Sequence, residues 1–172
     1  MAHIALWTRV RLLARACGLA FLCMATSNLG AQRADEYELK AAMVYNLLLF
    51  VTWPESSFSS STAPITVGVV GKDPFDRKLD RAILNKRVNG RPVVIKRFAT
   101  RPKDSECHLL YFAGEGGQKM MGVTNTSPVL TVGECGGFAT SGGMIQIDIV
   151  SGRGVLTINL GAARDSNLKV SS

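Results

Sequence analysis

Histidine and cysteine are scarce in this chain of 172 residues. Beyond residue 31 the sequence contains one histidine, His108, and two cysteines, Cys107 and Cys135. Structural zinc is held by four ligands, nearly always cysteine and histidine, so the sequence argues against a zinc protein. No cysteine or aspartate lies at metal-ligand spacing from His108, which opens an apolar segment. We therefore expect His108 to be a structural residue whose ring nitrogens are hydrogen-bonded.

Motifs of catalysis and of nucleotide binding are missing as well. The sequence has no Gly-x-Ser-x-Gly elbow of the kind that presents a nucleophilic serine. Residues 68–72 (GVVGK) contain two glycines and a lysine, but no serine or threonine follows Lys72, and Asp73 would repel a phosphate. We therefore expect a protein that is not an enzyme and that binds no cofactor or metal ion.

Residues 1–31 differ in character from the rest of the chain. Three arginines precede the apolar run 16–25, and small and polar residues follow as far as Ala31. This order is typical of a secretory signal peptide, and the apolar run is shorter than the roughly 20 residues that cross a bilayer. We expect cleavage after Ala31, which leaves residues 32–172 as an exported domain in the periplasm.

The excess of positive charge is small. Lysine and arginine number 20 against 13 acidic residues, which gives +7, and removing the three arginines of residues 1–31 lowers the net charge to +4. The basic residues are scattered, whereas a nucleic-acid-binding surface needs them clustered. With 47% hydrophobic residues and no long polar tract, the exported part is expected to be one globular domain that does not bind nucleic acid.

Helix and strand patterns alternate along the exported part. Residues 35–50 lack glycine and proline and carry acidic residues in the first turn, which predicts a helix. Residues 65–71 form a β-branched apolar run typical of a strand, and residues 73–84 have the spacing of an amphipathic helix. Further strands are expected over residues 93–98, 108–113 and 129–132.

A β-hairpin is expected near the C-terminus. Residues 144–150 and 155–160 alternate apolar and polar side chains, and residues 151–154 (SGRG) between them are typical of a turn. The order of elements predicts an α/β fold: a single domain with a mixed sheet of about six strands flanked by helices, a parallel front half and a C-terminal antiparallel hairpin.

A glycine-rich loop over residues 133–143 is the most unusual segment. If the hairpin is antiparallel, this loop shares one edge of the sheet with residues 161–167. An exposed aromatic residue flanked by charges of both signs is typical of a protein-binding surface, and the alternative is that the loop phenylalanine packs into the core. The candidate partner-binding residues at this edge are Glu134, Phe138, Arg164 and Asp165.

A small-ligand receptor is the alternative interpretation. Tyr45, Phe50 and Trp53 lie at the end of the first helix and just beyond it. Aromatic side chains of this kind commonly line apolar ligand pockets. We keep these residues as the candidate wall of such a pocket in a periplasmic small-ligand-binding protein.

Short motifs along the whole exported part resemble the YfiR family of periplasmic proteins (DUF4154 type). They are Asp35-Glu36-Tyr37, Lys40-Ala41-Ala42, Tyr45-Asn46, Phe50-Val51-Thr52-Trp53-Pro54, Val69-Val70-Gly71, Asp73-Pro74-Phe75, Gly90-Arg91-Pro92-Val93, Cys107-His108-Leu109-Leu110-Tyr111-Phe112, Val129-Leu130-Thr131-Val132, Gly142-Gly143-Met144-Ile145 and Ile158-Asn159-Leu160. The resemblance implies a non-enzymatic repressor that binds the periplasmic sensor domain of an inner-membrane diguanylate cyclase and so lowers cyclic di-GMP and biofilm formation. It also implies that an OmpA-like outer-membrane lipoprotein captures the repressor. The oligomeric state stays open, a homodimer included.

Cys107 and Cys135 are candidates for a disulfide, since the periplasm is oxidising. Cys107 precedes one expected strand and Cys135 follows the next. Parallel strands would therefore hold them about 20 Å apart, and antiparallel strands would bring them together. The link between the strands carries only a short helical turn, so we favour an antiparallel or distorted arrangement and a Cys107–Cys135 bond. The alternative is two separate thiols, one of them free to bridge a dimer.

Overall fold

The computed structural model describes residues 32–33, 35–114, 119 and 127–171. The chain divides into two compact units, Met1–Glu36 and Tyr37–Ser172, and the fold described here is that of the second unit. The signal peptide expected over residues 1–31 lies outside the described residues. In the part of the chain that the structure describes, no helix is both long enough and apolar enough to cross a membrane.

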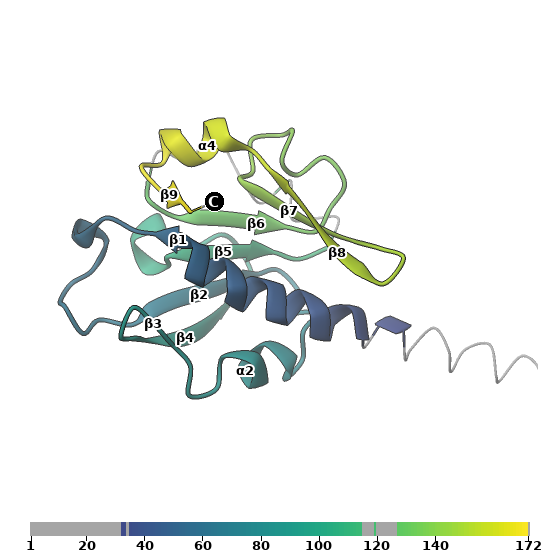
Figure 1. Cartoon of the computed structure of the whole chain (residues 1–172), viewed down its shortest axis with the longest axis horizontal. Coiled ribbons are helices and arrows are strands. Elements are labelled where there is room, and N and C mark those ends of the chain that lie inside the picture. The colour runs from purple at the N-terminus through teal and green to yellow at the C-terminus, as the bar shows by residue number, and fades with distance from the viewer. Residues whose placement is uncertain (1–31, 34, 115–118, 120–126, 172) are drawn as a thin grey trace, which may run out of the picture. The chain divides into compact units, whose positions relative to one another are not determined.

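Among the described residues, seven strands form the main sheet, in the order β3-β4-β2-β5-β6-β7-β8 (Figure 1). The strands from β4 to β7 run parallel to their neighbours, while β8 is antiparallel to β7 and β3 is antiparallel to β4. This confirms the mixed sheet and the C-terminal hairpin that the sequence predicts. The strands are β2 (Ile65–Val70), β3 (Arg87–Val88), β4 (Arg91–Phe98), β5 (Leu109–Phe112), β6 (Leu130–Gly133), β7 (Ile145–Val150) and β8 (Arg153–Ile158).

Shorter elements complete the unit. Residues 35–50 are helical, as predicted, and the part of this N-terminal helix from Tyr37 onward belongs to the second unit. A separate two-stranded antiparallel sheet joins β1 (Val51–Thr52) to β9 (Lys169–Val170). The remaining elements are η1 (Glu55–Ser57), α2 (Lys78–Ile83), η2 (Asp104–Glu106) and α4 (Leu160–Asp165).

The helix expected over residues 73–84 is shorter in the structure, where α2 begins at Lys78. The side chain of Asp73 accepts a hydrogen bond from the Phe75 backbone N–H at 2.8 Å, which is the geometry of an Asx turn. Asp76 then adopts a φ of +54°, a left-handed conformation that a helix cannot contain. These two local features convert the expected first helical turns into a loop.

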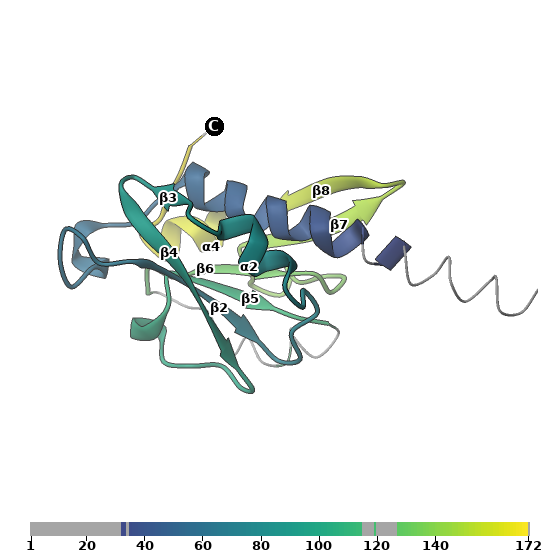
Figure 2. The same ribbon diagram turned by 90° about the horizontal axis from the view of Figure 1, so that it is seen from below.

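Apolar side chains cover both faces of the sheet. The N-terminal helix and α2 lie on one face (Figure 2) and share the larger hydrophobic cluster with the strands. A smaller cluster of seven buried residues, among them Phe112 and Phe138, covers the opposite face. Because both faces are covered, β2 and β5 are buried along their whole length, as is typical of central parallel strands.

The arrangement of β5 and β6 corrects the expectation for the two cysteines. The strands are parallel, with Leu109 opposite Leu130 and Phe112 opposite Gly133. Cys107 and Cys135 therefore lie beyond opposite ends of the pair, about 20 Å apart, and a disulfide tolerates no more than about 7 Å between Cα atoms. The antiparallel arrangement was wrong because residues 113–129 are long enough for a parallel crossover. Both cysteines are free and buried.

We expect two free thiols per chain when a protein comprising residues 32–172 is unfolded without reductant and treated with iodoacetamide. In the folded protein Cys107 should react slowly at neutral pH, because burial raises the pKa of its thiol to about 11 and the thiolate is the reactive form. Intact-mass measurement of the alkylated protein counts the thiols, with a pre-reduced sample as the control. A monomer that takes up no label until it is reduced would contradict the parallel geometry.

Candidate functional site

The carboxylate of Glu134 lies at the centre of a buried polar cluster just beyond the end of β6. Its Oε2 accepts hydrogen bonds from Lys40 Nζ at 2.7 Å and from the Tyr111 hydroxyl at 2.9 Å. Its Oε1 accepts from the Gly114 backbone N–H at 2.7 Å and from the Tyr37 hydroxyl at 3.4 Å. The side chain is only 5% exposed, so the expectation that Glu134 lies on an exposed edge was wrong.

The electrostatics of this cluster keep Glu134 ionised. Burial by itself would raise the pKa of the carboxyl, but the hydrogen bonds from Lys40, Gly114 and Tyr111 outweigh it and hold the pKa below its usual value. The Lys40 side chain is 6% exposed, so each charge of the pair depends on the other. The ion pair thus joins the N-terminal helix to the end of the sheet.

Aromatic rings close the cluster on one side. The Phe75 ring contacts Tyr37 edge-on at 5.7 Å and Tyr111 at 4.7 Å between ring centroids, and Lys40 Nζ lies 4.8 Å from the centroid of the Tyr37 ring. The carboxyl ends of parallel strands are where open α/β sheets commonly bind ligands. Here the chain's own donors satisfy the Glu134 carboxylate at that position.

Phe138 is the second predicted contact residue that the structure places in the core. Its side chain is fully buried, and its ring packs against Phe112 with 5.8 Å between centroids. A Cβ added to Gly133 or Gly143 would collide with the Phe138 ring. These two glycines therefore make room for an aromatic side chain, and the expectation of an exposed aromatic in this loop was wrong.

The other half of the predicted surface is exposed. Arg164 and Asp165 lie on the solvent side of α4, whose first residue, Leu160, is 55% exposed. The Asn159 side chain caps α4 by accepting from Ala162 N–H at 3.1 Å, and its Nδ2 donates to the carbonyl of Ala139 in the glycine-rich loop at 2.9 Å. The loop and the start of α4 are thus neighbours, as expected.

The alternative pocket residues lie in three different environments. Trp53 is buried and donates its Nε1–H to the carbonyl of His108 at 2.9 Å. Tyr45 packs against the core cluster with Lys86 Nζ 5.7 Å from its ring centroid. Phe50 is 53% exposed. The structure gives no support for these side chains lining one apolar pocket.

His108 has the structural role that the sequence predicts. Its Nδ1 accepts from the Thr66 backbone N–H at 3.0 Å and its Nε2 lies 3.2 Å from the carbonyl oxygen of Ser57, which fixes the tautomer with the proton on Nε2. The ring stacks on Phe58 at 4.5 Å. Burial lowers the pKa of His108, so the imidazole is neutral at physiological pH and lines a cavity of about 270 Å³.

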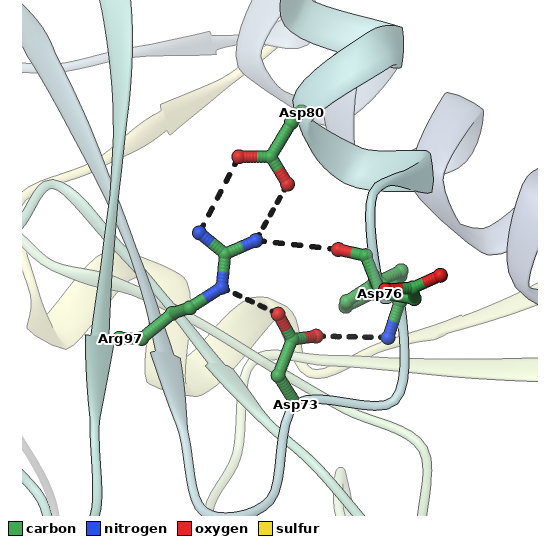
Figure 3. Close-up of polar contacts among 5 residues, drawn as sticks. Asp73, Asp76, Asp80 and Arg97 are labelled. Carbon is green, nitrogen blue, oxygen red and sulfur yellow. Dashed lines mark hydrogen bonds and ion pairs between the residues drawn. The ribbon is translucent and has the colours of Figure 1, made fainter.

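A charged groove between α2 and β4 was not foreseen. Arg97 donates to Asp73 at 2.6 Å and to both carboxylate oxygens of Asp80, and it reaches the backbone carbonyl of Asp76 (Figure 3). Asp80 and then Asp73 raise the pKa of Arg97 above its usual value. The groove, of about 600 Å³, is lined by these four residues with Arg77, Arg81 and Leu84.

This groove has no catalytic arrangement. The Arg97 guanidinium is shared between the carboxylates of Asp73 and Asp80. Among the residues that the structure describes, no group of three histidine, cysteine, aspartate or glutamate side chains could hold a metal ion. The contacts instead hold the loop after β2 against β4. The sequence alone gave no signal for them, because 24 residues separate Asp73 from Arg97.

Comparison with known proteins identifies a family. The model of a protein family described as YfiR/HmsC-like matches residues 37–172, which is the whole of the second unit. No curated protein matches the sequence.

Replacing the buried carboxylate should destabilise the fold. We expect Glu134→Gln to lower the free energy of unfolding by about 3 kcal/mol, because it removes the charge of the buried carboxylate that pairs with the Lys40 ammonium. The control is Glu38→Gln on the same helix, which breaks a largely exposed pair with Arg81 and should cost less than about 1 kcal/mol. Urea unfolding measures both, and equal losses would contradict the assignment. Adding Lys40→Met to Glu134→Gln should recover part of the loss.

Acidification should weaken the fold through His108. Its pKa is lower in the folded protein than the usual value of about 6.5, so protons bind preferentially to the unfolded chain. The contribution of the neutral His108 to the free energy of unfolding is therefore complete above about pH 6.5 and is lost as the pH falls below that value. Urea unfolding between pH 7.5 and 5.5 should therefore show a decline in the wild type that His108→Gln lacks. A decline of equal slope in the variant would refute the prediction.

Proposed function

The chain belongs to the YfiR/HmsC-like family, and we propose that it represses an inner-membrane diguanylate cyclase by binding the periplasmic sensor domain of that enzyme. The family consists of periplasmic regulators of cyclic di-GMP signalling, and it is regulatory rather than catalytic. The match over residues 37–172 is the observation that carries the proposal, since it includes every strand of the fold. Binding would hold the cyclase inactive and lower cyclic di-GMP and biofilm formation.

We place the cyclase contact on the α4 surface, which we define as Leu160, Arg164 and Asp165. It combines an exposed apolar side chain with one charge of each sign. In protein-binding surfaces the apolar contact contributes affinity, and the charges fix the orientation of the partner. The Asn159 bonds to Ala162 and Ala139 hold this surface in place. Glu134 and Phe138 are buried and are therefore left out of this surface.

Release of the cyclase requires a competing partner in this proposal. An OmpA-like outer-membrane lipoprotein would bind the repressor and so free the sensor domain. Because the lipoprotein and the cyclase would compete for the same repressor, the cyclic di-GMP level would depend on the state of the cell envelope. The α4 surface is small, so a lipoprotein that covers it excludes the cyclase sterically.

The experiment is complementation of a deletion strain. Deleting the gene should raise cyclic di-GMP and surface attachment, and the wild-type gene should restore both. The variant Leu160→Ser/Arg164→Glu should be exported at normal levels and fail to restore them, because exposed substitutions seldom change stability by more than about 0.5 kcal/mol. Mass-spectrometric quantification of cyclic di-GMP gives the result.

The matched control is Leu84→Ser/Lys72→Glu, which changes one exposed leucine and one exposed base near α2. In Figure 1, α2 and α4 lie at opposite edges of the sheet, so this variant should complement fully. Unchanged cyclic di-GMP in the deletion strain would refute the repressor function. Full complementation by the α4 variant would refute only the position of the contact.

A further inference from the structure

The cavity beside His108 lies at the amino ends of β5 and β6. Its walls come from η1, from η2 with the two residues before β5, and from the residues just before β6. Open α/β sheets commonly bind ligands at the carboxyl ends of their strands, but that end is filled here by Glu134 and its hydrogen-bond donors. The cavity is a separate feature of the fold, because neither the Glu134 cluster nor the α4 surface includes any of its residues.

Serine hydroxyls make up much of the wall. Four of the nine residues that line the cavity are serines, namely Ser56, Ser57, Ser105 and Ser127. Because a hydroxyl both donates and accepts hydrogen bonds, such a wall suits a molecule that carries several hydroxyls of its own. Pro128 and Val129 add an apolar part to the wall. The cavity therefore matches a molecule with hydroxyls on its rim and C–H groups on its faces.

The Ser57 hydroxyl is a buried group that the fold leaves unsatisfied. Its Oγ is shielded from solvent and has no hydrogen-bond partner among the residues that the structure describes. An unpaired buried hydroxyl costs free energy, and native structures rarely keep one. The backbone of Ser57 is held in place, since its carbonyl oxygen lies 3.2 Å from His108 Nε2. A ligand hydroxyl in the cavity would give Ser57 Oγ the partner that the chain does not provide.

The charge of the wall favours a neutral ligand. Asp104 is the one residue of the wall that carries a full charge, and the Arg101 guanidinium donates to its Oδ1 at 2.9 Å. Burial lowers the pKa of His108, so the imidazole adds no positive charge at neutral pH. An anion would meet the Asp104 carboxylate and no cation among the nine wall residues. An organic cation would have to compete with Arg101 for Asp104.

We propose that this cavity binds a small neutral polyhydroxy molecule of the size of a monosaccharide. Its volume of about 270 Å³ equals that of about nine water molecules at about 30 Å³ each, which admits one sugar ring. Hydroxyls of the ligand would bond to Ser57 and Ser105, and the Asp104 carboxylate would accept a further hydrogen bond. The face of the ring would lie against Pro128 and Val129. The proposal does not rest on cyclase repression.

Nuclear magnetic resonance of residues 32–172 tests the proposal, because His108 is the only histidine in that range. Its Cε1–H therefore gives a single signal from the wall of the cavity. The neutral probes are D-glucose, D-galactose, N-acetyl-D-glucosamine and D-ribose, each titrated at constant pH. At least one of them should shift the His108 signal saturably, with a dissociation constant below about 1 mM. Inorganic phosphate and benzoate, the anionic and aromatic control probes, should leave the signal in place.

Two variants of the wall should weaken this binding. Ser57→Ala should raise the dissociation constant by about fivefold, the usual value of one neutral hydrogen bond, and should not lower the stability to urea, because the hydroxyl has no partner to lose. Ser105→Phe, at an exposed position, should abolish binding by filling the cavity. The matched control is Ser59→Ala, the same change at an exposed serine outside the wall, and it should leave the dissociation constant unchanged.

The possible failures are distinct. A His108 signal that none of the four neutral probes shifts would overturn the proposal, and so would a signal that only phosphate or benzoate shifts. A saturable shift that both Ser57→Ala and Ser105→Phe leave unchanged would place the ligand elsewhere and would also overturn it. Cyclic di-GMP repression can persist in each case, which separates these failures from that of the repressor function.

Discussion

The ion pair between Glu134 and Lys40 is the contact on which the arrangement of the unit depends. It brings together three segments that are distant in sequence: the N-terminal helix, the end of β5 and the start of the glycine-rich loop. Neither charge would be tolerated at its depth alone, and the hydroxyls and backbone N–H around the carboxylate complete its hydrogen bonding. The helix therefore has one position on the sheet, and the larger hydrophobic cluster forms beneath it.

Much of the fold could be predicted because its signals are local. Alternation over residues 144–160, the apolar run that became β5 and the helix-forming segment 35–50 each specify their own conformation. The hairpin turn is specified in the same way, since Ser151 and Gly152 both adopt positive φ. What could not be predicted are relations between distant segments. The direction of β6 relative to β5 depends on the crossover and not on either strand.

In the candidate site, too, positions set by local sequence were predicted correctly and positions set by distant residues were not. A carboxylate with no charged neighbour in the sequence is predicted to lie on the surface. Lys40, the partner that allows Glu134 to be buried, is 94 positions away. Phe138 was misplaced for a related reason, because glycines around an aromatic residue indicate flexibility when their neighbours are unknown. His108 was placed correctly, since the apolar run after it already implied burial. Arg164 and Asp165 kept their exposed positions because α4 is short and amphipathic.

The buried position of the Phe138 ring limits which residues can replace Gly133 and Gly143 in related sequences. The ring occupies the space where side chains of residues 133 and 143 would stand, so the three positions share one volume. A larger residue at either glycine is compatible with the fold only if position 138 becomes smaller in the same lineage. These positions are therefore expected to covary among relatives, and a sequence that has lost one glycine but kept the phenylalanine would need a different backbone in this loop.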